Sequence, residues 1–123
     1  RACHGTDNFV PGPNIFNNGL ENFVGMDLGK GAITGVAADN GKFKVGSLRN
    51  IEFTAPYMHD GRFATLEEVV RHYSTGVKRG ATLDPNLAKH PDGGLQLSEA
   101  DQRALVAFLK TLTDPRWKPS VGR

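Results

Sequence analysis

The chain has 123 residues, enough for one domain with a single modest hydrophobic core. Its net charge of +2 is too small to indicate nucleic acid or an acidic membrane as a partner. The sequence also has no apolar run long enough to predict a membrane-spanning helix. Fifteen Gly and seven Pro residues predict that residues 1–123 form one loop-rich domain, and a single Cys excludes an internal disulfide bond.

The first residues are Arg1-Ala2-Cys3-His4-Gly5, in which a Cys is directly followed by a His. This pair is the second half of C-x-x-C-H, the attachment motif of c-type haem. In that motif two thiols form thioethers with the haem vinyl groups, and the His after the second thiol binds the iron. The first thiol would fall one residue before Arg1. A Cys-His pair also arises by chance, and a single Cys is commonly a small buried hydrophobe.

Residues 5–50 show little periodic structure. We expect a short turn of helix at residues 3–8, because haem-binding motifs commonly sit at a helix end. Alternating residues predict two short extended segments, at 42–45 and 51–54, on either side of Leu48-Arg49-Asn50.

Residues 54–61, Thr-Ala-Pro-Tyr-Met-His-Asp-Gly, form the most informative stretch. Met58 lies in a loop bounded by Pro and Gly, and a thioether is a soft, weak ligand for iron or copper. Met58 and His4 together would make the His/Met ligand pair of an electron-transfer haem. The alternative is a Met that fills a gap in the core beside a surface His59. We interpret His59 as a structural hydrogen-bonding residue, with Asp60 as its partner.

Two helices are predicted from their caps and periodicity. Thr65 and Glu68 form a capping box, and Gly76 is placed to end the first helix. The apolar positions of this helix are Leu66, Val69, Val70 and Tyr73. His72 is expected on its polar, solvent-facing side.

The second helix is predicted to begin after Ser98 and to end before Pro115. Its apolar face consists of Leu105, Val106, Phe108, Leu109 and Leu112. Between the two helices, residues 80–94 are predicted to form a polar loop.

Four blocks of the sequence resemble the C-terminal haem domain of bacterial di-haem cytochrome c peroxidases. They are Ala2-Cys3-His4-Gly5, Phe16-Asn17-Asn18-Gly19-Leu20, Gly41-Lys42-Phe43-Lys44 with Leu48-Arg49-Asn50, and Thr54-Ala55-Pro56-Tyr57-Met58-His59-Asp60-Gly61-Arg62-Phe63. The similarity continues through residues 65–70 and Tyr73 to the helix after Ser98. In the family a proline commonly stands at the position of Gly46. The related maturation enzymes of methylamine dehydrogenase place a tyrosine where the peroxidases place the distal methionine, so Met58 points to the peroxidase branch.

The resemblance implies a mostly α, cytochrome c-like haem domain. Such domains pack a helix that precedes the haem motif across the C-terminal helix. That helix and the first Cys of C-x-x-C-H are absent from these 123 residues. We therefore expect a fragment of a larger di-haem protein, with the apolar face of residues 105–112 partly uncovered.

The resemblance also implies the residues of a haem c site. Cys3 would form the thioether bond, and His4 and Met58 would be the axial ligands of the iron. Arg49 and Arg62 are candidates to bind the haem propionates, because guanidinium groups hold carboxylates well. A solvated or structural role is the alternative for each arginine.

In the family this haem takes electrons from a small donor protein, a cytochrome or a copper protein. It relays them to a second haem in an N-terminal domain, where hydrogen peroxide is reduced. This segment alone would thus transfer electrons and hold no catalytic residue. The resemblance further implies a periplasmic location, and calcium at a domain interface through ligands that we do not assign to residues.

Other interpretations stay open. The domain would itself be catalytic if Met58 moved away from the iron. Cys3, His4, Met58 and His59 would also suit a copper site, although the predicted helices argue against the usual β-sandwich. The chain would alternatively belong to another di-haem oxidase, or be an apo fragment with a structural or interaction role.

Overall fold

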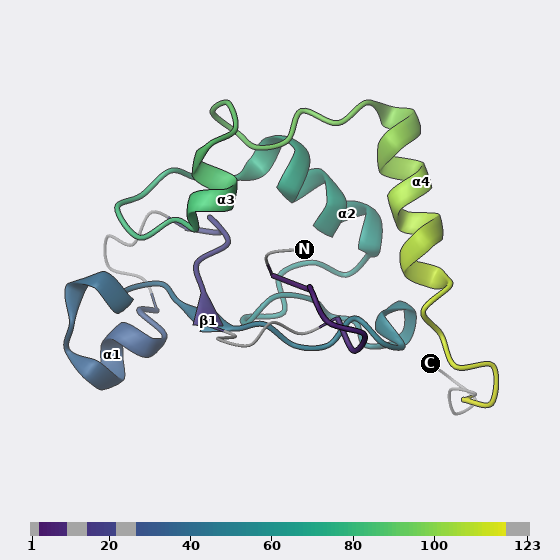
Figure 1. Ribbon diagram of the computed structural model, residues 1–123, viewed down its shortest axis with the longest axis horizontal. Coiled ribbons are helices and arrows are strands. Elements are labelled where there is room, and N and C mark those ends of the chain that lie inside the picture. The colour runs from purple at the N-terminus through teal and green to yellow at the C-terminus, as the bar shows by residue number, and fades with distance from the viewer. Residues whose placement is uncertain (1–2, 10–14, 22–26, 118–123) are drawn as a thin grey trace.

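The computed structural model describes residues 3–9, 15–21 and 27–117 of the chain. The helices and strands in chain order are β1 (Ile15–Phe16), α1 (Lys30–Thr34), β2 (Phe43–Lys44), α2 (Leu66–Arg71), α3 (Pro85–Ala88) and α4 (Glu99–Lys110). Long irregular segments join them, as Figure 1 shows, so the loop-rich character predicted from Gly and Pro is confirmed. Ala2, which opens the first resembling block, lies outside the described residues.

The hydrophobic core lies where α2 packs against α4 (Figure 1). Side chains of both helices are buried there with Tyr57, namely Leu66, Val70, Val106 and Leu109. Full burial of an aliphatic side chain contributes about 1.5–3 kcal/mol. The Tyr57 hydroxyl donates to the carbonyl oxygen of Ile51 (2.7 Å). The residue directly before Met58 therefore ties the 54–61 loop to the core.

Both predicted helix starts are confirmed. The backbone N–H of Glu68 donates to Thr65 Oγ1 (3.2 Å), and the Glu68 carboxylate accepts from the backbone N–H of Thr65 (3.1 Å). Ser98 Oγ accepts from the backbone N–H of Asp101 (3.1 Å) at the start of α4. These contacts satisfy N–H groups that a helix leaves without partners at its first turn.

The helical coil of α2 continues beyond Arg71 as a π-helical turn, His72–Gly76, and ends at Gly76 as predicted. A π turn fits one more residue into a turn than an α-helix does, which rotates the following side chains to new directions. His72 is only 6% exposed. The expectation that His72 lies on the surface is therefore wrong, because Asn18 and Phe63 lie against its ring and cover that side of the helix.

The remaining local predictions are confirmed only in part. Phe43–Lys44 is a strand, paired antiparallel with Ile15–Phe16. Residues 51–54 are not extended, since Ile51–Phe53 form a 3₁₀ turn. Residues 3–8 contain a turn rather than a helix, with the backbone N–H of Phe9 donating to the carbonyl of Thr6 (2.8 Å). The predicted 80–94 loop contains α3, where the Asp84 side chain caps the helix by accepting from Asn86 N (2.8 Å).

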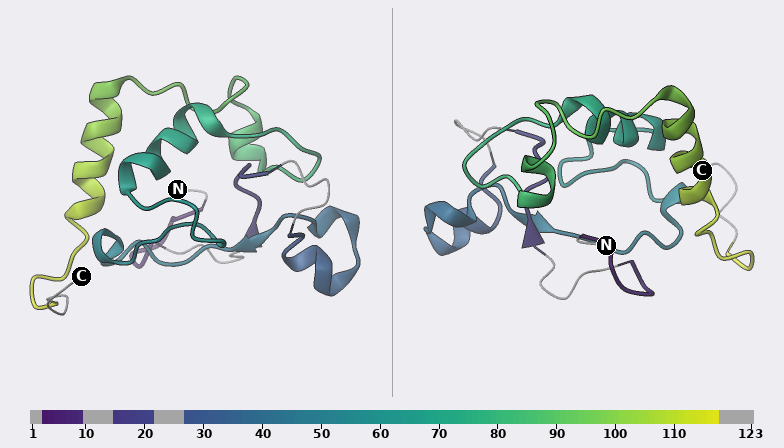
Figure 2. Two further views of the ribbon diagram at one scale, coloured as in Figure 1. Left: turned by 180° about the vertical axis from the view of Figure 1, so that it is seen from behind. Right: turned by 45° about the horizontal axis from the view of Figure 1, so that its top comes forward.

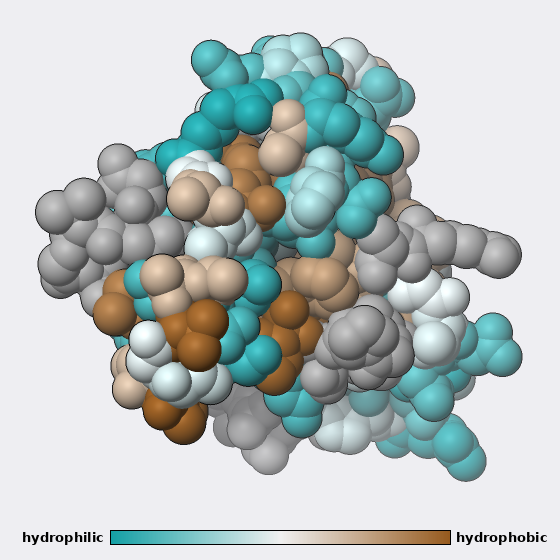
Figure 3. Space-filling model, turned by 60° about the vertical axis from the view of Figure 1, so that its left-hand side comes forward, coloured by the Kyte–Doolittle hydropathy of each residue, from teal (hydrophilic) through white to brown (hydrophobic). Residues whose placement is uncertain are grey.

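Two groups of apolar side chains face solvent. On α4, Leu105 is 36% and Phe108 is 48% exposed, which agrees with the partly uncovered face predicted for residues 105–112. At the other end of the molecule, α1 stands apart from the helical pair in all three ribbon views (Figures 1 and 2). Ile33 of α1 is 88% exposed, and hydrophobic side chains gather on this face (Figure 3). None of the helices in the described part of the chain has the length and apolar character that a membrane crossing requires.

Candidate functional site

The N-terminal loop fixes the orientation and proton position of His4. Its Nδ1 lies 2.8 Å from the carbonyl oxygen of Phe9. A carbonyl oxygen only accepts hydrogen bonds, so Nδ1 carries the proton. In the neutral ring Nε2 then keeps its lone pair, which is the arrangement that a metal-binding imidazole needs.

Arg49 anchors this N-terminal loop to the segment before the 3₁₀ turn. Its Nε donates to Asn8 Oδ1 (3.1 Å), and its Nη2 donates to the carbonyl of Asp7 (3.0 Å). The Ser47 hydroxyl donates to the carbonyl of Asn8 (2.7 Å). Arg49 therefore lies beside the Cys3-His4 loop, and its side chain donates there to oxygen atoms of uncharged groups.

The loop that carries Met58 is closed at its base by Tyr57 and Phe63, whose backbones form an antiparallel bridge. The backbone N–H of Tyr57 donates to the carbonyl of Phe63 (2.8 Å). Met58 adopts a left-handed backbone conformation, with φ 74°. Such a conformation is uncommon outside glycine and costs about 1–3 kcal/mol, so the surrounding contacts must hold it in place.

Asn18 joins this loop to the π turn after α2. Its Nδ2 donates both to Met58 Sδ (3.3 Å) and to the Tyr73 hydroxyl oxygen (3.2 Å). An amide group has two N–H bonds, so one group satisfies both acceptors. The thioether and the phenol are thereby held next to each other.

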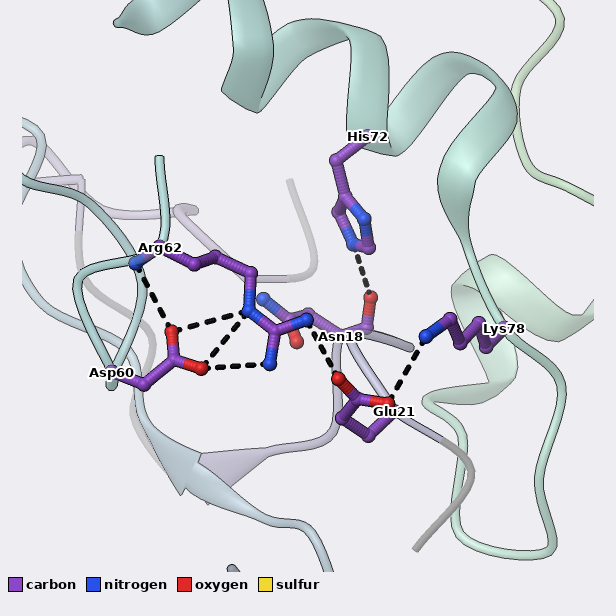
Figure 4. Close-up of polar contacts among 6 residues, drawn as sticks. All are labelled: Asn18, Glu21, Asp60, Arg62, His72 and Lys78. Carbon is purple, nitrogen blue, oxygen red and sulfur yellow. Dashed lines mark hydrogen bonds and ion pairs between the residues drawn. The ribbon is translucent and has the colours of Figure 1, made fainter. Parts of the chain in front are cut away.

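His72 supports Asn18 from the other side. The His72 Nε2 lies 3.0 Å from the carbonyl oxygen of Asn18 and therefore donates to it (Figure 4). Burial lowers the pKa of His72 below its ordinary value of 6.5, and the hydrogen bond to Asn18 only partly opposes this effect. The ring is thus neutral at pH 7, packed edge-on against Tyr73.

Tyr73 connects the two parts of the candidate site. Burial raises the pKa of its hydroxyl, the hydrogen bond from the Asn18 amide opposes that rise, and the negative charge of a Cys3 thiolate adds to it. Cys3 is itself half-buried, and burial is also the main reason why its pKa is raised. Cys3 and Tyr73 therefore lie within electrostatic reach of each other.

Arg62 is engaged by two carboxylates. Its Nη1 pairs with Glu21 Oε1 (2.7 Å) and its Nη2 with Asp60 Oδ2 (2.7 Å), and Lys78 also pairs with Glu21 (3.0 Å; Figure 4). The hydrogen bonds from Arg62 are the largest cause of the lowered pKa of both carboxyl groups. Arg62 thus ties the Met58 loop to the segment that carries Asn18.

His59 points to a different neighbour from the one predicted. Its ring stacks on Phe43, with ring centroids 3.7 Å apart and planes inclined by 10°. The carboxylate of Asp60 is bound to Arg62 instead. In the described ranges, no group of three or more His, Cys, Asp or Glu side chains is arranged to hold a metal ion.

Sequence reasoning missed two residues of this site. Asn18 and Tyr73 both lie in stretches that carry the family resemblance, but neither has a local signal for its contact with Met58. Asn18 lies 40 residues before Met58 and 55 before Tyr73. Only the fold brings these side chains together.

The chain is similar in sequence and in structure to several known proteins. No protein-family model matches the chain. The cytochrome c peroxidase IdrP2 of Pseudomonas sp. (strain SCT) is 46% identical over 101 residues, which are 80% of this chain and 25% of that protein. The methylamine utilization protein MauG of Methylorubrum extorquens is 38% identical over 113 residues, 90% of this chain and 30% of that protein.

A solved structure agrees with these relatives. The crystal structure of a MauG-like protein associated with microbial copper homeostasis superposes with a TM-score of 0.70 and 39% identity, over 91% of this chain and 41% of that one. The chain spans only a quarter to a third of the length of the two curated relatives. It therefore matches one part of a di-haem enzyme of the cytochrome c peroxidase and MauG family.

Proposed function

We propose that this chain is a c-type haem domain of a di-haem, cytochrome c peroxidase-like enzyme. Haem is attached through the Cys3 thiol, and His4 Nε2 is one axial ligand of the iron. The observation that carries the proposal is the hydrogen bond between His4 Nδ1 and the Phe9 carbonyl, in a residue that directly follows the only Cys. It leaves Nε2 as the metal-binding atom of a correctly oriented ring.

The residues around Cys3 fit a haem. Imidazole, thioether and phenolate are all known axial ligands of haem iron, and the chain offers each of them. Cys3 lies within electrostatic reach of Tyr73, and Tyr73 and Met58 share the Asn18 amide. A haem bound here supplies one-electron transfer. The chain's own residues orient the ligands and bury the site.

The first candidate for the second axial ligand is Met58, as the sequence predicts. A His/Met pair raises the reduction potential and suits electron relay. In this case the domain receives electrons from a small cytochrome or copper protein and passes them to a peroxide-reducing haem in another domain. A periplasmic location, and calcium at the domain interface, belong to this proposal.

The second candidate is Tyr73, and specific observations favour it. It is half-buried in a π turn, an irregularity that is frequent at functional sites, and its hydroxyl lies within electrostatic reach of Cys3. A Tyr73 ligand would make the chain a haem domain of another type of di-haem oxidase. It would differ from the methylamine-dehydrogenase maturation enzymes, whose tyrosine stands at the position of Met58 rather than at that of Tyr73. The similarity to MauG and to a MauG-like structure is compatible with this second function.

Attachment of haem is tested first. In the protein matured with haem, mass spectrometry should find one haem added per chain through Cys3, and the reduced pyridine complex should confirm the count. The variant Cys3→Ser is the control and should carry no covalent haem. A wild-type protein without added mass and without a Soret band would refute the haem function.

The variants Met58→Ala and Tyr73→Phe then identify the second ligand. Loss of the low-spin spectrum and a shifted reduction potential in Met58→Ala alone would assign Met58 and the electron-relay function. The same changes in Tyr73→Phe alone would assign Tyr73 and the second function, that of another type of di-haem oxidase. A low-spin spectrum that both variants retain would refute both ligands.

A further inference from the structure

We propose that Asn18 is a positioning residue that sets the distal axial ligand of the haem, by holding Met58 Sδ and the Tyr73 hydroxyl with its two amide hydrogens. This inference rests on the proposed haem function. It gives a role to a residue that lies in a block of family resemblance but that the sequence alone did not connect to Met58.

The orientation of the Asn18 amide follows from its partners. A thioether sulfur can only accept a hydrogen bond, so the amide nitrogen and not the amide oxygen must face Met58. The Tyr73 oxygen lies 3.2 Å from the same nitrogen and accepts its other hydrogen. Rotating the amide by a half-turn would lose the bond to Met58, because the sulfur has no hydrogen to donate, whereas the Tyr73 hydroxyl could donate to the amide oxygen. Met58 therefore fixes the orientation of the amide.

The backbone on both sides of Asn18 is anchored. The carbonyl of Asn17 accepts from the backbone N–H of Asp84 (3.0 Å), and the carbonyl of Gly19 accepts from that of Lys78 (2.7 Å). The carbonyl of Asn18 itself accepts from His72 Nε2 (3.0 Å; Figure 4). Three successive carbonyl groups are therefore bound to residues 72–84, and the amide cannot follow a ligand that moves.

Gly19 allows this close fit. Its φ is +72°, and a Cβ added there would lie 2.5 Å from Val77 Cγ1 and 3.0 Å from Leu83 Cδ1. Segment 17–21 is thus pressed against the chain that follows the π turn. Asn18 is held by the same part of the fold that holds Tyr73, whereas Met58 approaches from a separate loop.

These contacts give Asn18 two effects on a haem ligand. A hydrogen bond to the ligand atom withdraws electron density from it, and hydrogen bonds near an axial ligand are one of the ways in which a protein adjusts haem potential. The acceptor that does not bind iron stays bound to Asn18 and away from the metal. Removing the donors should therefore lower the reduction potential and let the two side chains compete for the iron.

The test compares Asn18→Leu and Asn18→Asp with Asn17→Ser in the haem-loaded full protein. Asp has nearly the volume of Asn and Leu has its branched shape, and neither side chain has the N–H donors of Asn. We expect each to shift the reduction equilibrium about tenfold toward the oxidised form, which is about 59 mV for a one-electron couple. Asn17 is the matched control, because its amide binds Thr82 and no candidate ligand. Asn17→Ser should lower stability without moving the potential.

A second measurement separates positioning from general disturbance. The effect of Asn18→Leu on the potential should disappear when it is combined with the variant that removes the ligand, whether Met58→Ala or Tyr73→Phe. If both Asn18 variants bind haem with the wild-type potential, or if Asn17→Ser shifts it equally, the proposal for Asn18 fails while the haem function stands. If the wild-type protein binds no haem, the proposed function itself fails.

Discussion

At the scale of single residues, the two arginines that could bind a haem propionate differ in whether they already form ion pairs with carboxylates. Arg62 is already neutralised by Glu21 and Asp60. Within the described ranges the Arg49 side chain donates to a carbonyl and an amide oxygen beside the Cys3-His4 loop, and Asp114 interacts with it through charge without a hydrogen bond. An additional carboxylate would compete with two existing ion pairs at Arg62, whereas no described carboxylate forms an ion pair with Arg49. Arg49 is therefore the better candidate for a propionate.

The contacts of Arg62 predict a structural role with a defined pH dependence. Replacing Arg62 by Gln should lower the free energy of unfolding by about 1 kcal/mol at pH 7, because a network of partly exposed ion pairs is worth little more. The pKa values of Glu21 and Asp60 are lowered in the folded protein from 4.5 and 3.8. The stabilisation is hence complete above these ordinary values and disappears as the pH falls through the lowered ones.

Urea denaturation of wild type and Arg62→Gln between pH 7 and pH 2 measures this effect. Arg116→Gln is the matched control, since Arg116 pairs only with Asp114 two residues away and joins no distant segments. The two unfolding curves should converge at the acid end. A difference that persists unchanged at pH 2 would show that Arg62 acts through packing rather than charge.

At the scale of elements, local signals predicted the helix starts but not the irregular turn that builds the site. Thr65, Glu68 and Ser98 satisfy N–H groups within three residues, so their effect can be read from adjacent sequence. The π turn at His72–Gly76 depends on partners far along the chain. The backbone N–H groups of Leu95 and Gln96 donate to the carbonyls of Tyr73 and Ser74 (2.9 Å each).

The difference between local signals and partners that are distant in the sequence also explains why the roles of single residues were not predicted. His72 is buried although its backbone N–H bonds to Glu68 as in a regular helix, because Asn18 and Phe63 from other segments lie against its ring. Asn18 had no visible role, because its partners come from two other segments. The resemblance supplied the blocks that contain these residues, but the contacts between the blocks required the fold.

The segment that satisfies the π turn requires glycine at position 94. Gly94 has φ +129°, and a Cβ added there would collide with the carbonyl group of Tyr73. Gly94→Ala should therefore lower the free energy of unfolding by about 2–3 kcal/mol and disturb the position of Tyr73. Chemical denaturation gives the first effect, and the spectrum of the haem-loaded protein gives the second.

Gly46→Ala is the control for this substitution. Gly46 has no other atom within 4 Å of an added Cβ and is not in the left-handed region. Its replacement should be neutral or stabilise by about 0.5 kcal/mol, through a less flexible unfolded chain. Equal effects of the two substitutions would mean that the close approach of Gly94 to Tyr73 contributes nothing.

At the scale of the whole molecule, the described core is small for the length of chain that it must order. One cluster of five buried side chains joins α2, α4 and Tyr57, and much of the remaining described chain is loop. Ordering each residue costs about 1–2 kcal/mol of backbone entropy alone. A large apolar cofactor near Cys3 would add contacts to the loops that this core does not reach.

We therefore expect haem to raise the thermal stability of this chain. A ligand present at about 100 times its dissociation constant stabilises the folded state by about 2.7 kcal/mol, and about 4 °C of melting temperature accompanies each kcal/mol at this size. The haem-loaded protein should consequently melt about 10 °C above the haem-free one in calorimetry. Cys3→Ser given the same haem should fall between them, because it keeps the contacts but loses the covalent bond. Equal melting temperatures for all three would show that the loops around Cys3 gain no contacts from haem.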